Sequence, residues 1–316
     1  MSIPSLSDIK RAHTRIYPYV VNTPVITSRT INELVDGEVF FKCENLQKVG
    51  AVEMRGVANY VFSTRSDLRK NGFATHSSGN HAQAVAKAAA LAGVKAYIVM
   101  PQDAPPVKIA AVRGYGAELT LCEPNEAARK EACDKIVKET GAIQIHGYDD
   151  PIIIAGNATA GKELIEEEPD LDFVLCPVGG GGMAAGTTLI THYVSPSTKV
   201  ILAEPENVND AYLSFQSGER QTLPVDHKPT VADGLQISIG ELNFEIIKKY
   251  ADSIETVSEE EIISAMRFVW ERMKMVIEPS AAVPVALLLK NKEQFTGKKT
   301  GVILVGGNVQ VDNLPF

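Results

Sequence analysis

The middle of the chain reads Phe173-Val174-Leu175-Cys176-Pro177-Val178-Gly179-Gly180-Gly181-Gly182-Met183, and this stretch decides the fold. Its apolar first half predicts a buried β-strand, and the Ala-rich segment that follows, residues 183–192, predicts a helix. Glycines between a strand and a helix let the backbone approach a ligand closely and point consecutive N–H groups at an anion. We therefore expect the loop to bind a phosphate or another anion.

The same alternation of short apolar runs and longer helical stretches continues on both sides of this loop. The expected strands are residues 73–76, 96–100, 118–121, 173–176, 199–203 and 301–305, and the expected helices are residues 82–91, 127–140, 158–168, 183–192 and 259–274. This order predicts an α/β protein with twisted, mainly parallel sheets and helices on both faces. Ligands bind such sheets at the carboxyl ends of the strands.

Composition narrows the class of protein. The 316 residues are 45% hydrophobic and 22% charged, which is typical of a soluble enzyme and not of a disordered chain. The net charge of −8 is not gathered in a tail, and the absence of a Lys/Arg run argues against nucleic acid as a partner. We see neither a secretory leader nor an apolar run long enough to span a membrane. Four widely spaced cysteines without CxxC spacing indicate free thiols and a cytoplasmic location.

A second segment, Gly50-Ala51-Val52-Glu53-Met54-Arg55-Gly56, follows the strand-like run at residues 39–46. It resembles the lysine loop of serine racemases and threonine or serine dehydratases, the second fold type of pyridoxal-phosphate enzymes. That loop reads Gly-Ala-Phe-Lys-Phe-Arg-Gly, and its lysine forms a Schiff base with the cofactor. Here Glu53 stands at the lysine position, and a carboxylate cannot form an imine.

The resemblance runs from about residue 6 to the end of the chain and implies a two-lobed fold like that of tryptophan synthase β. It implies a large domain of residues 1–70 and 146–316, with a small domain of residues 71–145 inserted into it. It also implies a homodimer.

The string Ser77-Ser78-Gly79-Asn80-His81 turns from a strand into a helix, where N–H groups can hold an anion or merely cap the helix. The string resembles the family's substrate-carboxylate loop. By that resemblance Ser77, Gly79 and His81 hold the substrate carboxylate, Asn80 contacts the cofactor ring, and Ser78 is an acid/base group.

Arg129 lies on a predicted helix, where an arginine is commonly exposed to solvent. It also matches a family arginine near the substrate entrance, and both interpretations stay open.

The resemblance assigns the cofactor phosphate to Gly179, Gly180, Gly181, Gly182 and Met183. Val305 stands where the family has a serine that bonds the pyridine nitrogen, and losing that bond costs about 1 to 3 kcal/mol. Glu278 matches a second position near the ring and can compensate in part.

Val52 and Met54 replace the two phenylalanines that flank the lysine, so the departures cluster around the ring. We expect no lysine-linked pyridoxal phosphate, although the glycine loop could still hold the cofactor noncovalently. Lys48 could in principle replace the lysine, but its counterpart in the family belongs to the loop and not to the ring.

Glu204, the carbonyl of Val208 and Asp210 follow a predicted strand. Their spacing alone suits a solvated acidic loop, but two carboxylates and a carbonyl also suit a hard cation. They match the Mg²⁺ or Ca²⁺ site of serine racemases. Lys108 and Tyr115 match residues around the nucleotide effector site of that family.

Two hypotheses for the function follow. In the first, the chain is a lyase or isomerase for a small amino- or carboxy-acid, and Glu53 and Ser78 are its acid/base groups. A lone carboxylate is too weak a base for an unactivated α-proton, so such a substrate must carry its own activation. In the second, the chain is an inactive protein that binds a small or phosphate-bearing ligand and regulates a partner. A weak enzyme with noncovalently held pyridoxal phosphate is a further alternative.

Overall fold

The computed structural model describes residues 2–77, 79–104 and 106–316 of the chain. Its larger sheet has six strands in the order β1-β2-β10-β7-β8-β9. Their bounds are Val25–Thr27, Glu38–Cys43, Lys299–Leu304, Phe173–Pro177, Lys199–Pro205 and Ser253–Val257, in that order. Only the edge strand β1 pairs antiparallel, and the other pairs are parallel. Their carboxyl ends therefore meet at one edge of the sheet.

The smaller sheet has four strands in the order β5-β4-β3-β6, and all of its pairs are parallel. The bounds are Glu118–Cys122, Ala96–Pro101, Phe73–Thr75 and Ile143–Gln144, in that order. All four strands come from residues 73–144, as the predicted small domain requires. The exact domain boundaries remain a prediction.

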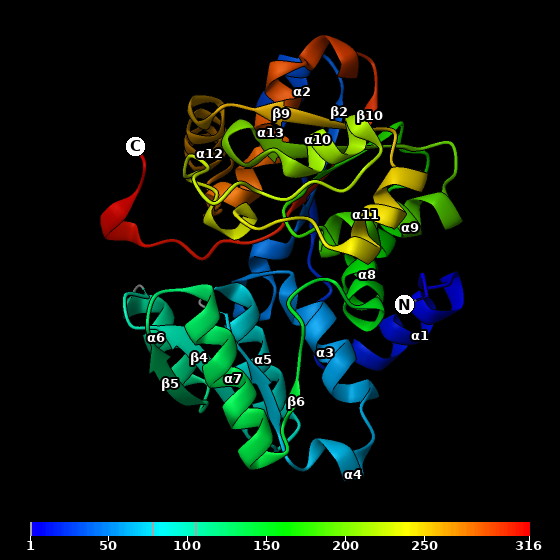
Figure 1. Ribbon diagram of the computed structural model, residues 1–316. Helices are drawn as coiled ribbons and strands as arrows, with labels where there is room; N and C mark the ends of the chain where they lie inside the picture. Colours follow the sequence, from blue (N-terminus) through cyan, green and yellow to red (C-terminus); the bar gives the residue numbers. More distant parts are fainter. Residues whose placement is uncertain (1, 78, 105) are drawn as a thin grey trace.

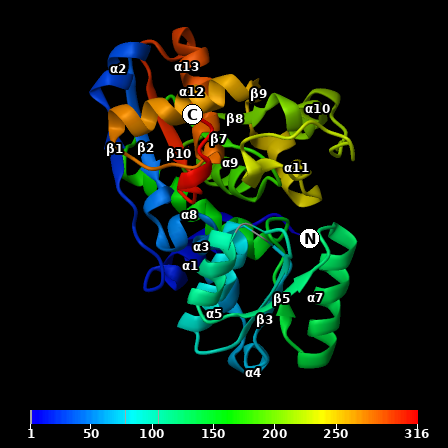
Figure 2. The ribbon, with the colours of Figure 1, turned by 90° about the vertical axis from the view of Figure 1, so that its left-hand side faces the viewer.

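Helices cover both faces of each sheet (Figures 1 and 2). Around the larger sheet, α8 (Pro151–Glu167) and α9 (Gly182–Val194) pack on one face, and α13 (Pro279–Lys290) and α12 (Glu259–Met273) pack on the other. Around the smaller sheet lie α5 (Asn80–Leu91), α6 (Pro106–Gly114) and α7 (Glu126–Thr140). The remaining helices are α1 (Leu6–Ile16), α2 (Arg29–Val35), α3 (Glu53–Ser63), α4 (Ser66–Arg69), α10 (Asp210–Ser217) and α11 (Glu241–Tyr250). The predicted α/β class is confirmed.

Helix α8 begins well before the predicted residue 158. Asp150 caps it, because its Oδ1 accepts hydrogen bonds from the N–H groups of Ile152 (2.7 Å) and Ile153 (3.3 Å), and Pro151 suits the first helical turn. Helices α1, α2, α3, α4, α6, α10, α11 and α13 were not predicted. Their side chains are held in place by contacts between distant parts of the chain, which a local pattern does not register.

Two large hydrophobic cores meet at the start of α3. Val52 belongs to the core that surrounds the larger sheet, together with residues of β2, β7, β8 and β10. Met54 belongs to the core that α3 shares with α5 and the smaller sheet. Glu53 therefore lies in the chain between a residue of one core and a residue of the other. No helix in the described part of the chain is long and apolar enough to cross a membrane.

Candidate active site

Glu53 is the first residue of α3, and the C-terminal strand holds the turn before it. The N–H of Val52 donates to the carbonyl of Val305 (2.9 Å), and the N–H of Gly307 donates to the carbonyl of Gly50 (2.9 Å). Val305 itself is buried directly after β10. The structure thus brings together residues 53 and 305, which are far apart in the sequence. A carboxylate at this position also interacts favourably with the positive end of α3.

The turn into Glu53 is strained. Val49 has a φ of 61° and Gly50 a φ of 69°, so two consecutive residues adopt left-handed backbone conformations. That conformation is unfavourable for a β-branched residue such as valine and is found mostly where the surrounding structure enforces it. Here the carbonyl of Val49 accepts a hydrogen bond from Asn308 Nδ2 (2.8 Å), which fixes the turn against the residues after β10.

The Glu53 carboxyl group is only partly satisfied. Its Oε2 is buried and has no hydrogen-bond partner among the described residues. The pKa of Glu53 is raised to about 7, chiefly by desolvation and to a lesser extent by the charges of Glu44 and Asp233, although hydrogen bonds from the backbone and Asn80 act to lower it. The group therefore titrates near neutral pH, as a general acid or base should.

Glu278, the N-cap residue of α13, is a second buried carboxyl group beside Glu53. Asn80 Nδ2 donates to its two oxygens (3.1 and 3.3 Å), and the Asn308 N–H donates to its Oε2 (3.1 Å). Asn308 Nδ2 in turn donates to Asn80 Oδ1 (2.9 Å). Desolvation, followed by the charges of Glu53 and Asp233, raises the pKa of Glu278 to about 8. The two carboxyl groups thus oppose each other's ionisation.

Close approach of Glu278 to the strand end requires Gly306. A Cβ added at Gly306 would lie 2.6 Å from Glu278 Oε1, so any other residue there would displace the carboxyl group. The structure therefore brings Asn80 and Glu278 together, and their contact with a cofactor ring stays a prediction. Asn308 completes this network, and its place directly after Gly306 and Gly307 was the signal that could have identified it.

The glycine loop lies between β7 and α9 and is buried throughout its four glycines. None of the N–H groups from Gly179 to Met183 has an acceptor among the described residues, although the carbonyl of Gly180 accepts from Gly240 and Asn243. Gly181 has a φ of 91°, which turns the chain into the helix. A row of N–H groups at a helix start is the kind of arrangement that binds anions in proteins, so anion binding by this loop stays a prediction.

Two neighbours press on the glycine loop so closely that side chains would not fit. A Cβ at Gly180 would lie 2.6 Å from the Tyr148 ring, and one at Gly179 would lie 2.7 Å from Leu235 Cα. Leu235 belongs to the short 3₁₀ helix Asp233–Leu235. The loop therefore needs its glycines for packing, as well as for the free N–H groups.

The predicted carboxylate loop is described except for Ser78, which lies outside the described residues. Ser77 Oγ accepts a hydrogen bond from the N–H of Gly79 (3.2 Å), just before α5 begins at Asn80. His81 is buried, with Nε2 at 3.4 Å from the carbonyl of Ile145, and its Nδ1 has no partner in the described part of the chain. Burial lowers the pKa of His81 to about 4, so this imidazole is neutral at pH 7.

Arg129, on α7, lies near the same loop. Its charge, after desolvation, lowers the pKa of His76, so the two side chains are close enough to interact. Arg129 is partly buried and not fully exposed. The arginine predicted for the substrate entrance is therefore next to the carboxylate loop.

The structure brings the predicted cation ligands together at the start of α10. Glu204 is fully buried and accepts hydrogen bonds from the N–H groups of Ala211 (3.0 Å) and Tyr212 (2.7 Å). Asp210 Oδ2 accepts from Ile239 (2.8 Å), whereas its Oδ1 is buried and has no partner among the described residues. Desolvation raises the pKa of Glu204 well above its usual value and that of Asp210 to about 6.

Those two carboxyl groups have the burial and the free oxygen that a bound cation would satisfy. The described residues contain no group of three or more His, Cys, Asp or Glu side chains arranged for a metal. A cation here would therefore also need backbone carbonyl or water ligands, as the predicted use of the Val208 carbonyl implies.

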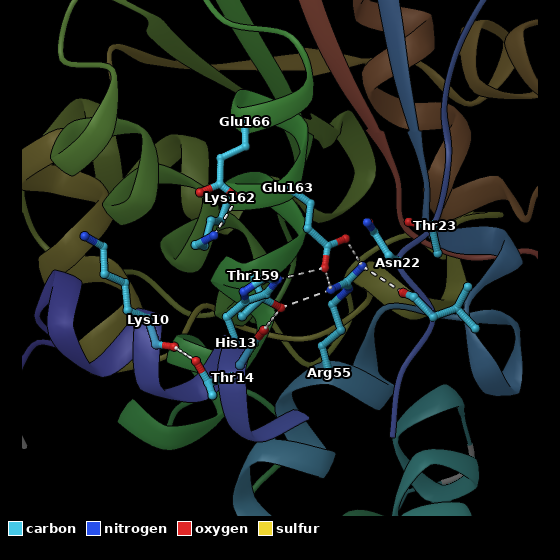
Figure 3. Close-up of polar contacts among 12 residues, drawn as sticks. Lys10, His13, Thr14, Asn22, Thr23, Arg55, Thr159, Lys162, Glu163 and Glu166 are labelled. Carbon is cyan, nitrogen blue, oxygen red and sulfur yellow. Dashed lines mark hydrogen bonds and ion pairs between the residues drawn. The ribbon is translucent and has the colours of Figure 1, made fainter. Parts of the chain in front are cut away.

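Beneath the site, an ion-pair network fixes the orientation of α3 (Figure 3). Arg55 is fully buried and bonds Glu44 through Nε (2.7 Å) and Glu163 through Nη1 (2.7 Å) and Nη2 (2.6 Å). Lys42 Nζ lies 2.7 Å from Glu163, so two cations balance two carboxylates. Sequence analysis missed this network, because its members are far apart in the chain.

A cleft of about 370 Å³ opens beside the carboxyl network and is lined by Gln83, Lys108, Asp233, Pro279 and Asn308, among others. Lys108, from α6, forms a 2.6 Å ion pair with Asp233 and so connects the small lobe to the large one. Tyr115 lies under Lys87, 5.4 Å from ring centre to Nζ. Because Lys108 is one of the residues that line the cleft, it faces the space beside the carboxyl network.

Known proteins resemble this chain over its full length. The profile of the family described as "Pyridoxal-phosphate dependent enzyme" matches residues 16–307. The β-hydroxyaspartate dehydratase of Paracoccus denitrificans is 46% identical over 316 residues, which cover 100% of both chains. The crystal structure of serine racemase from Dictyostelium discoideum superposes with a TM-score of 0.93 at 44% identity, covering 98% of this chain and 100% of that one. A pyridoxal 5'-phosphate-dependent aspartate racemase superposes with a TM-score of 0.93 at 39% identity, covering 100% and 99%.

Proposed function

The chain belongs to the family of pyridoxal-phosphate dependent enzymes, and we propose that it is a lyase or isomerase of small carboxylic acids that works without a lysine-bound cofactor. Glu53 and Ser78 would be its acid/base groups. The proposal rests on one observation above all: a carboxyl oxygen of Glu53, between the two cores, is buried and has no hydrogen-bond partner among the described residues.

The residues present fit pyridoxal phosphate at one end only. The free N–H groups from Gly179 to Met183 fit a phosphate. At the other end, the position that the resemblance assigns to the lysine holds the Glu53 carboxyl group, which cannot form an imine. Lys42 is already paired with Glu163, and Lys108 with Asp233. We therefore derive no reaction through a lysine-linked cofactor.

Glu53 has the properties of an acid/base group by itself. Its pKa of about 7 leaves it partly ionised at neutral pH, and Asn80 holds the neighbouring Glu278. In an elimination, Glu53 would take a proton from the carbon next to the substrate carboxylate, and the electron pair of that C–H bond would form a C=C bond. The leaving group would depart from the adjacent carbon with a proton supplied by Ser78. The substrate must supply activation, such as a keto group, an electron-poor double bond or a good leaving group.

Arg129 and His76 support a substrate with a second carboxylate. The loop from Ser77 to His81 would hold one carboxylate at the start of α5, and Arg129, whose charge acts on His76 just before that loop, would hold another. Two of the proteins that the chain resembles are named for β-hydroxyaspartate and aspartate, which are dicarboxylic. We therefore take small dicarboxylic acids as the first substrates to test.

The proposal is tested by proton NMR of the purified protein with a panel of hydroxy-, keto- and amino-dicarboxylic acids. Solvent ²H exchange at the reacting carbon reports proton transfer even without net turnover. We expect exchange or product with wild type, a loss of about 100-fold or more in Glu53→Gln, and no change in Glu245→Gln, an exposed residue on α11. Equal rates in wild type and Glu53→Gln would contradict the role of Glu53. Ligand binding without exchange would instead favour a regulatory protein.

Two further features are proposed with this function. Asp210 Oδ1 and Glu204 would bind Mg²⁺ or Ca²⁺ together with the Val208 carbonyl. The chain would form a homodimer, and exposed apolar side chains such as Leu46 and Val276 would be available to its interface. Analytical ultracentrifugation tests the dimer.

A further inference from the structure

The site leaves unsatisfied groups of opposite polarity at its two ends. At the glycine loop, consecutive N–H groups from Gly179 to Met183 have no acceptor among the described residues. At the start of α3, Glu53 Oε2 is buried and lacks a donor in the same described part of the chain. The N–H groups of the glycine loop can bind an anion, and the Glu53 carboxyl group can bind a hydrogen-bond donor that carries positive charge.

One short element connects these two ends. In the 3₁₀ helix Asp233–Leu235, the backbone of Leu235 lies against Gly179. Asp233, at the other end of the same turn, is near enough to act electrostatically on both Glu53 and Glu278. The glycine loop follows β7, and Val305, which holds the turn before Glu53, follows β10. These strands are parallel neighbours, so the anion site and the carboxyl pair lie at the same edge of the larger sheet.

Three carboxyl groups, those of Glu53, Glu278 and Asp233, gather at this end, and among the described residues neither Glu53 nor Glu278 has a cationic partner. Glu278 is 5% exposed, and its described partners are neutral: the Asn80 side chain and the Asn308 N–H. Lys108 lies nearby but is paired with Asp233, and Arg55 is bound by Glu44 and Glu163 on the other side of α3. A ligand with an aldehyde or a hydroxyl group would leave this charge unbalanced.

We propose that this site binds a phosphate ester bearing a primary ammonium group, with the phosphate on the N–H groups of Gly179 to Met183 and the ammonium on Glu53. Pyridoxamine 5'-phosphate belongs to this class and is the amine counterpart of the family's aldehyde cofactor. Val305 offers no side-chain donor or acceptor where the resemblance places the ring nitrogen. The site therefore selects its ligand by the contacts that the glycine loop makes with the phosphate and that Glu53 makes with the ammonium group. The inference shares with the proposed function the central place of Glu53, but it concerns binding and requires no turnover.

Isothermal titration calorimetry of the purified full-length protein tests the inference with three ligands that share a ring and a phosphate. Pyridoxamine 5'-phosphate carries the ammonium, pyridoxine 5'-phosphate a hydroxyl, and pyridoxal 5'-phosphate an aldehyde. Above pH 8, where Glu53 is ionised, we expect the amine to bind at least about tenfold more tightly than the alcohol, equivalent to about 1.4 kcal/mol. Inorganic phosphate should compete with both.

Two variants separate the carboxylate from overall charge. Glu53→Gln removes the charge while keeping the shape, and it should bind the amine and the alcohol equally. Glu245→Gln changes the net charge by the same amount on an exposed part of α11 and should keep the wild-type preference. Circular dichroism establishes that each variant is folded.

The inference is overturned if wild type binds the alcohol or the aldehyde as tightly as the amine, if Glu53→Gln keeps the preference, or if none of the three ligands binds. Because the readout is heat of binding, a protein that binds the amine but catalyses no proton exchange would uphold this inference and contradict only the proposed function.

Discussion

The N–H of Val52 donates to the carbonyl of Val305 across 2.9 Å, so two positions at which the sequence departs from the expected motifs are in direct contact. Glu53 follows Val52, and Met54 follows Glu53 into the second core. The departures are therefore one connected region around a carboxyl group. This favours a site that diverged as a whole over one that lost a single residue.

Replacing Glu53 with glutamine should stabilise the protein, and the gain should grow with pH. A carboxyl group whose pKa is higher in the folded than in the unfolded chain makes the folded state retain its proton. The free energy of unfolding then falls as pH rises from the usual 4.5 towards about 7 for Glu53 and about 8 for Glu278. Above about pH 8 both carboxyl groups are ionised, and the free energy of unfolding that their ionisation removes no longer changes with pH.

Urea denaturation at several pH values between about 5 and 9 measures this effect. We expect Glu53→Gln to be about 1 to 3 kcal/mol more stable than wild type at the upper end and nearly equal at the lower end. His81 has the opposite effect, because its lowered pKa makes stability rise with pH up to about 6.5. Because wild type and variant both contain His81, its contribution cancels when their free energies of unfolding are compared. A pH-independent difference would show that Glu53 is already ionised at low pH.

Replacing Glu53 with lysine should restore the ability to form an imine. Because the free N–H groups of the glycine loop remain, we expect pyridoxal phosphate to give a visible absorption band that borohydride removes. Adding Val305→Ser should strengthen deamination of serine or threonine by about tenfold, since it offers the ring nitrogen a hydrogen bond worth about 1 to 3 kcal/mol. If the single variant forms no imine, the region around α3 has been remodelled beyond this one position.

Replacing Arg55 with methionine should destabilise the protein strongly, because Glu44 and Glu163 would stay buried without their shared partner. Removing one member of a buried ion pair costs about 3 to 5 kcal/mol. The matched control is Arg29→Met, whose pair with Glu33 is largely exposed and should matter by less than about 1 kcal/mol. Similar urea midpoints for the two variants would show that the network does not hold α3.

Mg²⁺ or Ca²⁺ should raise the thermal unfolding temperature of wild type, and a chelator should reverse the increase. In Asp210→Asn the increase should disappear, because Oδ1, which has no partner in the described part of the chain, is then no longer part of a carboxylate. Asp103→Asn, at an exposed turn, serves as the control. If wild type and Asp210→Asn respond alike, the cation binds elsewhere.

Much of the fold could be predicted from the sequence, because strands that alternate with helices leave a clear hydrophobic pattern. Each predicted strand overlaps an observed one, and Gly179 to Gly182 lie between β7 and α9 as expected. Helix α8 extends further than its Ala-rich part, since Asp150 and Pro151 set its start. Helix α3 was missed because its apolar side faces a core that forms only when α5 packs against it.

The sequence predicted individual residues of the site, but it did not predict the hydrogen bonds between them. The motifs identified Asn80, Glu278 and Glu53 separately. That Asn80 bonds Glu278, that Asn308 bonds Asn80, and that Asp233 influences both carboxyl groups depends on loops from four distant segments. The raised pKa of Glu53 likewise follows from burial between two cores, which a single sequence position does not encode.

The most direct test of the central claim is the absorption spectrum of the purified wild-type protein with pyridoxal phosphate, before and after borohydride, followed by peptide mass spectrometry. With Glu53 at the centre of the site, we predict no borohydride-sensitive imine band and no pyridoxyl-modified lysine. An imine band that borohydride abolishes, together with a single modified lysine, would contradict the account.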